Sequence, residues 1–345
     1  MNKKTGLTKN NILVGFLIAI AIVVAVAAVV MLDTTGKKGS GLSREYLYDL
    51  KTLGKIDPNL ILYEQSPNPI ITGLKASRAI AVDFDGMIYI AGDNAVSRID
   101  TDGINKLISL AEMPGCLAVA KDGTIYVGLK DHIEIYDAKG GQIAKWDSLS
   151  EKAILTSIAV SENNVFVADA GNRIVLRYDT GGKLINKIGK PDPDKNIPGF
   201  LIPSPYFDIA VAGDGLLRAV NPGMCRIEAY TFEGDLEFWW GKSSADIKGF
   251  CGCCNPVNFA ILDDDSFVTC EKGLVRVKIY DSEGNFIGVV AGPEILDKNG
   301  SWIPCASPSE CQTRGYDIAV DKKGRIFVLD TVRDIVRIFT KIKSE

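Results

Sequence analysis

The sequence predicts an all-β protein, a six-bladed β-propeller, preceded by one transmembrane helix. Two observations carry this prediction. An uncharged apolar run lies near the N-terminus, and short runs of β-branched and aromatic residues recur after it between Gly and Asp turns. Four such runs repeat about every 40 to 60 residues, which is the spacing of propeller blades.

The apolar run covers residues 12–32 and contains no charged residue. As a helix rising about 1.5 Å per residue, it can cross a hydrocarbon core of about 30 Å. Lys3, Lys4 and Lys9 precede it, so the positive-inside rule places residues 1–11 in the cytoplasm and the rest of the chain outside. A cleaved signal peptide, cut near Ala25–Ala27, is the alternative. Because the run is long for the apolar region of a signal peptide, we favour an uncleaved anchor.

The remaining chain divides into a linker over residues 33–58 and a propeller over residues 59–345. With 39 basic and 43 acidic side chains, the chain has a net charge of −4. Nucleic-acid binding calls for a clustered basic face, so this balance argues against a nucleic-acid partner. We therefore expect a single-pass protein of the cytoplasmic membrane with its propeller on the extracytoplasmic side, in the periplasm or at the cell surface.

The first strand of each predicted blade carries a short apolar motif. Six copies predict six blades. The sixth blade lacks a fourth strand, and Leu60–Glu64 could supply it, so that the two ends of the propeller close the ring and leave no exposed sheet edge. The six first strands are Ala79–Val82, Cys116–Val119, Ser157–Val160, Asp208–Val211, Asn258–Ile261 and Asp317–Val320.

The third repeat carries a family resemblance. Its segment Phe166–Asp179 (FVADAGNRIVLRYD) resembles an NHL repeat, and the other five units are looser versions. The CGCCNP segment, Cys251–Pro256, is similar to one in bacterial membrane-anchored NHL proteins of unassigned function. The resemblance covers residues 60–340 and implies a six-bladed NHL-type propeller. Such propellers include lyases, hydrolases, sensors and binding platforms, so the resemblance implies no single function.

The chain has eight cysteines, and we expect all of them to approach one face, where each blade's second-to-third-strand loop and its connection to the next blade emerge. Outside the cytoplasm an even number of cysteines favours disulfides, and Cys305 and Cys311 are close enough in sequence to bridge. The alternatives are a redox-active pair or a thiolate site for zinc, copper or an iron–sulfur cluster. The candidate metal ligands are Cys225, Cys251, Cys253, Cys254, Cys270 and Cys305.

Three long insertions, at about 189–205, 241–256 and 291–315, fall on the same face and are predicted to cap blades four to six. Long connections in a compact domain are usually functional. Beneath them, Cys116, Asp208, Asn258 and Asp317 are expected to ring the mouth of the central channel. Their oxygens could hold calcium or another divalent cation, or could bind channel water instead.

The other polar motifs suggest less. His132 is the one histidine of the chain, and we expect a solvent-facing loop residue rather than a catalytic base. The segments Asp83–Gly86 and Asp263–Asp265 are predicted to be hairpin turns.

Three functions are compatible with these features. The first is a tethered binding module that holds a protein or small molecule on the capped, cysteine-rich face. The second is a metal-binding or electron-transfer accessory protein that uses the thiolates. The third is a metal-dependent hydrolase or lyase that uses Asp208 and Asp317 at the channel mouth. No catalytic set assembles in the sequence, so we favour the binding module over an enzyme.

Overall fold

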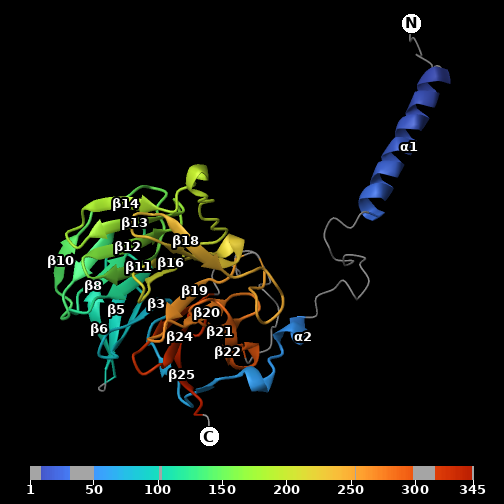
Figure 1. Ribbon diagram of the computed structural model, residues 1–345. Coiled ribbons are helices and arrows are strands. Elements are labelled where there is room, and N and C mark those ends of the chain that lie inside the picture. Colours follow the sequence, from blue (N-terminus) through green and yellow to red (C-terminus); the bar gives the residue numbers. More distant parts are fainter. Residues whose placement is uncertain (1–8, 32–49, 101–102, 253, 298–314, 344–345) are drawn as a thin grey trace. The chain divides into compact units, whose positions relative to one another are not determined.

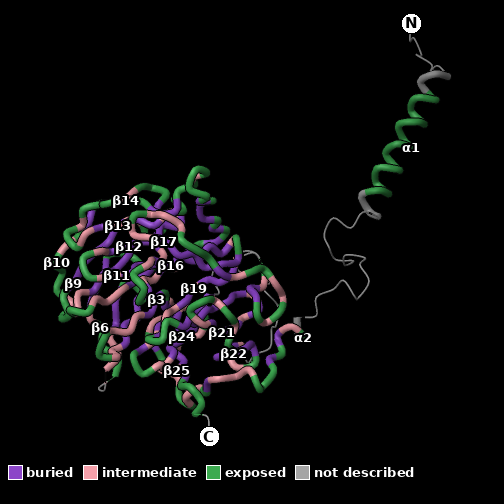
Figure 2. The backbone as a smooth tube through the Cα atoms, viewed as in Figure 1, coloured by how far each residue is buried: buried purple, intermediate pink, exposed green. Residues whose placement is uncertain are grey.

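A computed structural model describes residues 9–31, 50–100, 103–252, 254–297 and 315–343 (Figure 1). The chain divides at residue 50 into two units. The first contains helix α1 (Lys9–Met31), which forms over the apolar run and whose described side chains, at 12–28, are exposed (Figure 2). Among the residues that the structure describes, no helix is long and apolar enough to cross a membrane.

The second unit is the predicted six-bladed β-propeller. Its first five blades are four-stranded antiparallel sheets in which sequential strands are neighbours. Blade one contains β3 (Ser77–Val82), β4 (Ile88–Gly92), β5 (Ala95–Asp100) and β6 (Gly103–Ser109). Blade two contains β7 (Cys116–Val119), β8 (Ile125–Gly128), β9 (Ile133–Tyr136) and β10 (Gln142–Lys145). Blade three contains β11 (Leu155–Ser161), β12 (Asn164–Asp169), β13 (Ile174–Asp179) and β14 (Leu184–Ile188). Blade four contains β15 (Ile209–Val211), β16 (Leu217–Asn221), β17 (Arg226–Tyr230) and β18 (Leu236–Trp240). Blade five contains β19 (Asn258–Ile261), β20 (Phe267–Glu271), β21 (Arg276–Tyr280) and β22 (Phe286–Ala291).

The sixth blade is built from both ends of the propeller. Strands β23 (Tyr316–Val320), β24 (Ile326–Asp330) and β25 (Ile335–Lys341) come from the end of the chain. Strand β1 (Tyr63–Gln65) supplies the outer strand by pairing with β25, and β2 (Ile70–Ile71) pairs further along β25. The closure predicted from residues 60–64 is confirmed, with its strand beginning at Tyr63.

The propeller unit begins before the predicted boundary at residue 59. It includes α2 (Leu50–Gly54) and the 3₁₀ turn η2 (Pro58–Leu60). Between them Ile56 is buried, and its side chain fills the space beside Gly292 that a β-carbon would occupy. The part of the predicted linker around Ile56 is therefore packed onto the end of blade five.

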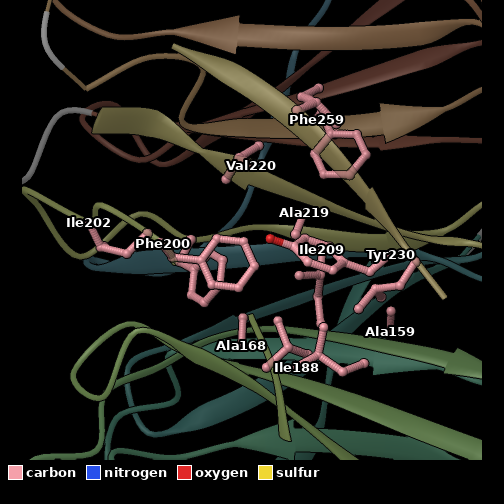
Figure 3. Packing of buried hydrophobic residues seen from close by; sticks show 14 of the residues in the cluster. Ala159, Ala168, Ile188, Phe200, Ile202, Ile209, Ala219, Val220, Tyr230 and Phe259 are labelled. Carbon is pink, nitrogen blue, oxygen red and sulfur yellow. The ribbon is translucent and has the colours of Figure 1, made fainter. Parts of the chain in front are cut away.

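The hydrophobic core lies between neighbouring blades. Each inner strand contacts the inner strand of the next blade, and β23 returns to β3. Five buried clusters occupy the spaces between adjacent blades. Figure 3 shows residues of the cluster that joins blades three to five, where Phe200, Tyr230 and Phe259 pack among aliphatic side chains. Close packing of this kind holds the blades at fixed angles.

Aspartate and glycine shape the hairpins at the other end of the blades. The Asp83 carboxylate accepts hydrogen bonds from the amides of Asp85 and Met87, and Gly86 adopts a φ of 83°. An aspartate that caps its own turn in this way explains why Asp and Gly punctuate the repeats. The predicted hairpin turn at Asp83–Gly86 is thus confirmed.

Candidate functional site

The inner strands bring six side chains together around the central channel. Each is the first residue of the short motif that repeats in the six inner strands. All six line one cavity of about 500 Å³. These residues, called here the channel ring, are Ala79, Cys116, Ser157, Asp208, Asn258 and Asp317. The ring contains the four residues expected at the channel mouth and adds Ala79 and Ser157.

Ring side chains bridge four of the six blade boundaries. Asp208 accepts hydrogen bonds from the Ser157 hydroxyl at 2.6 Å and from the Phe259 amide at 2.8 Å, joining blades three, four and five. The Asn258 side-chain amide donates to the Tyr316 carbonyl at 2.6 Å. Asp317 accepts the Ile80 amide at 2.8 Å, across the junction of blades six and one. The carboxylates therefore serve as acceptors for backbone donors.

Burial changes the ionisation of the ring. Desolvation raises the pKa of Asp208 to about 6, although its three hydrogen bonds favour the charged form. Desolvation and the nearby Asp208 charge raise the pKa of Asp317 to about 7. Desolvation and both carboxylates also raise the pKa of the Cys116 thiol, which keeps it neutral. The two aspartates thus titrate near neutral pH.

The expectation that all eight cysteines approach one face stays a prediction, because the structure describes five of them. Cys270 is fully buried in the core cluster between blades five and six, and Cys116 lies in the channel ring. No disulfide joins any two of the five described cysteines, and no group of three or more described His, Cys, Asp or Glu side chains could hold a metal ion. The candidates Cys253, Cys305 and Cys311 lie outside the described residues.

From the repeat alignment Cys270 was expected at the end of the second strand of blade five, level with Asp169, but the structure places it one residue earlier. Asp169, the last residue of β12, pairs with Ile174, whereas the last residue of β20 is Glu271, which pairs with Arg276. Glu271 is therefore the counterpart of Asp169. Cys270 lies one residue earlier, and because side chains alternate along a strand it points to the opposite face of the sheet.

This second-strand column fastens the connections between blades, a role that the sequence analysis missed. Asp169 accepts the Ile154 amide at 3.1 Å, and Asn221 accepts the Leu201 amide at 2.9 Å. Glu271 likewise accepts the Cys251 amide at 2.7 Å. The signal available in the sequence was a polar residue at the end of each of these second strands.

Glu271 belongs to a fully buried ion cluster. It accepts two hydrogen bonds from Arg276, at 2.6 and 3.0 Å, and lies 3.1 Å from the Lys278 amine. Lys278 also donates to the Gly249 carbonyl at 2.6 Å. Burial is the main cause that lowers the pKa of Lys278 to about 8. The cluster therefore attaches the 241–256 insertion to blade five.

His132 is buried, contrary to the expectation of a solvent-facing loop residue. Only 5% of its surface is exposed. Its Nδ1 lies 2.8 Å from an Asp131 carboxylate oxygen, and its Nε2 lies 3.5 Å from Glu134. The two flanking carboxylates are the physical reason that a polar ring can be buried at this position.

A cavity of about 1110 Å³ opens over blade three and is called here the strap groove. One wall is the connection over residues 146–150, and another is the loop 169–174 with the outer strands of blade three. Residues 190–201, the first part of the predicted 189–205 insertion, form the third wall together with Met224. We call the 189–205 insertion the strap.

The strap has a fixed shape. Gly189 adopts a φ of 80°, and a β-carbon there would overlap the Phe200 ring, so only glycine permits the turn and the packing. Asp192 caps the 3₁₀ turn η3 (Pro193–Lys195) by accepting the Asp194 amide. Phe200 then packs 4.6 Å from Phe207, measured between ring centroids. The strap wall of the groove is therefore held in place by its own turns and packing.

Aromatic and charged side chains line the groove. The Trp146 and Tyr178 rings pack with their centroids 4.9 Å apart and their planes tilted by 37°, and the pKa of Tyr178 is raised to about 12, mainly by burial. Arg173, Lys187 and Lys190 line the same space. The arrangement offers an apolar surface bordered by cations, which is typical of small-molecule sites.

Comparisons with known proteins identify the fold alone. No protein-family model matches the sequence, and no curated protein matches it. A streptogramin B lyase structure is 12% identical, covering 83% of this chain and 100% of that chain, with a TM-score of 0.57. A gluconolactonase from Xanthomonas campestris is 14% identical over 84% of this chain and 98% of that one, with a TM-score of 0.55. The WD40 propeller domain of Doa1 is 16% identical over 77% and 79%, with a TM-score of 0.51.

Proposed function

We propose that this chain is a ligand-binding propeller, tethered to a membrane, whose binding site is the strap groove. The observation that carries the proposal is the groove itself. A cavity of about 1110 Å³ has about the size of small-molecule sites, and two of its walls are connections outside the blade sheets. Proteins with similar folds include enzymes and a WD40 domain, so the fold is compatible with catalysis and with binding.

The channel ring gives less support to a metal-dependent hydrolase or lyase. Its carboxylates already accept backbone amides from neighbouring blades, namely those of Phe259 and Ile80. A divalent cation bound by Asp208 and Asp317 would compete with these donors and with the blade junctions that they make. The ring therefore has a sufficient structural role.

The thiolate alternative likewise has weaker support. Metal ligation needs a deprotonated thiol, and burial is the first cause that raises the pKa of Cys116, Cys251 and Cys270. The other proposed ligands include Cys253 and Cys305, which lie outside the described residues. A thiolate-bound metal thus remains an alternative that draws on the sequence.

The tether and the NHL assignment are also proposals. The uncharged run at residues 12–32, with three lysines before it, supports an anchor that places the propeller on the extracytoplasmic side. In blade three the Asn172 amide donates to Asp169 at 2.6 Å, which gives the NHL-like motif a structural role. Membrane fractionation with alkaline extraction, followed by protease treatment of intact cells, tests the anchor and its orientation.

A blocked groove tests the binding site. Met224 lines the groove and is 39% exposed, so Met224→Trp adds bulk inside it. Val332→Trp is the matched control, because Val332 is an exposed apolar loop residue that does not line the groove. In a thermal-shift screen of small organic molecules, compounds that stabilise the wild type and the control should fail to stabilise Met224→Trp. Hits retained by Met224→Trp would place the binding site elsewhere.

A further inference from the structure

The cations of the strap groove have no ion-pair partners in the described part of the chain. Arg173, Lys187 and Lys190 are all exposed, and none of them forms a salt bridge there. Many other basic side chains of the propeller are paired, such as Lys195 with Asp235 at 2.6 Å. Three unpaired cations around one cavity are therefore available to a ligand.

Few acidic groups offset these cations. Among the lining residues the carboxylates are Asp147 and Asp169. Asp169 is 1% exposed, and its oxygens already accept the amides of Ile154 and Asn172 and the Asn172 side chain. Asp147 alone is exposed. The groove is thus locally positive on a chain whose net charge is −4, which attracts anions to this position over others.

The rest of the lining is apolar. The Trp146 and Tyr178 rings pack together and are largely buried, and Leu184, Leu201 and Met224 are 40%, 47% and 39% exposed. When a ligand covers apolar side chains that are exposed inside a cavity, the complex is stabilised by about 25 cal/mol per Å² of apolar area buried. A ligand that used the groove fully would present an apolar body as well as a charge.

We propose that the strap groove takes a small organic anion: a carboxylate, sulfonate or phosphate group on a flat apolar body. This inference rests on the proposed function, since it names the ligand class of the same site. The anionic group would be held by Arg173, Lys187 and Lys190, and the body would cover the Trp146 edge and the exposed aliphatic side chains that line the groove. The cavity of about 1110 Å³ holds one such molecule rather than a polymer.

A matched pair of probes separates charge from shape. The sodium salt of 2-naphthalenesulfonate and the neutral 2-naphthalenesulfonamide have nearly the same body and differ in charge. Isothermal titration of the full chain in a nonionic detergent, with empty micelles as the blank, measures both. We expect the sulfonate to bind about tenfold more tightly than the sulfonamide, and this difference to shrink at high ionic strength.

Charge reversal tests the residues. Lys187→Glu combined with Lys190→Glu should weaken sulfonate binding about tenfold or more and leave the sulfonamide nearly unchanged. Lys139 is exposed and lies outside the groove. Lys139→Glu reverses one charge there and should alter the binding of neither probe. Circular dichroism of each variant checks the fold.

The outcomes distinguish this inference from the proposed function. Equal binding of both probes, with no effect of charge reversal, would overturn the anion inference while leaving the groove as a binding site. Failure of both probes to bind the wild type at millimolar concentration would also overturn it. Sulfonate binding that persists in Met224→Trp would instead contradict the proposed function.

Discussion

The carboxylate of Asp317 accepts the Ile80 amide at 2.8 Å, and this hydrogen bond crosses the junction between the last blade and the first. Asp208, on the other side of Asn258 in the ring, makes the equivalent bond to the Phe259 amide across the junction of blades four and five. Two acidic side chains thus hold blades together at positions where burial opposes their charge.

Stability should therefore fall as the pH rises through the pKa values of these two groups. The pKa values of about 6 and 7 lie above the ordinary aspartate value, so between about pH 4 and pH 7 the folded chain binds more protons than the unfolded chain. The stabilisation is complete below the unfolded pKa and is lost on passing the folded one. Thermal unfolding should show a higher midpoint at about pH 6 than at about pH 8.

Asp317→Asn supplies the control for that measurement. An amide does not titrate, so the variant should lose the part of the pH dependence that comes from Asp317 while Asp208 keeps its own. An unchanged slope between the two pH values would show that Asp317 is not a source of it.

Gly189→Ala should destabilise the strap. A β-carbon at this φ of 80° is strained and also overlaps the Phe200 ring, so we expect a loss of about 2–4 kcal/mol in the free energy of unfolding. Gly215→Ala is the matched control, because Gly215 has a φ of 78° and no atom near the added carbon. It should cost about 1–2 kcal/mol. Equal losses in urea unfolding would argue against the Phe200 contact.

Glu271→Gln should be among the more damaging single changes. It leaves Arg276 and Lys278 buried without their carboxylate, and breaking one partner of a buried ion pair costs about 3–5 kcal/mol. Lys278→Met keeps the Glu271–Arg276 pair and should cost less, about 1–2 kcal/mol for the lost carbonyl contacts. Denaturant unfolding of both variants gives the comparison, and a larger loss for Lys278→Met would contradict it.

Ser66→Pro tests the closure of the ring. The Ser66 amide donates to the Ile338 carbonyl at 2.8 Å, beside the pairing of β1 with β25. Proline removes this donor, so we expect a loss of about 1–2 kcal/mol and earlier proteolysis near β1. Ser66→Ala keeps the amide and should stay within about 0.5 kcal/mol of the wild type.

Repetition is the reason that so much of the fold could be predicted. The motif before each apolar run recurs with the same register in every blade, so aligning Asp208, Asn258 and Asp317 was enough to place them around one channel. Closure by residues near Leu62 followed from a missing strand. These inferences depend on short-range patterns of apolar and turn residues, which indicate strands and hairpins directly.

The parts that failed depend on single-residue register and on contacts between distant segments. Cys270 lies one residue before the second-strand column that fastens the connections. Because alternate strand residues face opposite ways, its side chain enters the core instead. His132 was expected to face solvent, but the carboxylates of Asp131 and Glu134 lie beside its two ring nitrogens and it is buried. The strap groove brings residues 146–150 against 190–201, and no local pattern encodes that approach.

The composition of blade six sets the order in which the ring can assemble. During synthesis β1 emerges first, yet its partner β25 becomes available only when Ile335–Lys341 have been made. Domains fold progressively from the N-terminus as the chain emerges, so five blades can form while the β1 edge stays unpaired. Joining β1 to β25 is then the last step, and a nascent chain halted before Ile335 would carry an open sheet edge exposed to proteases and to other chains.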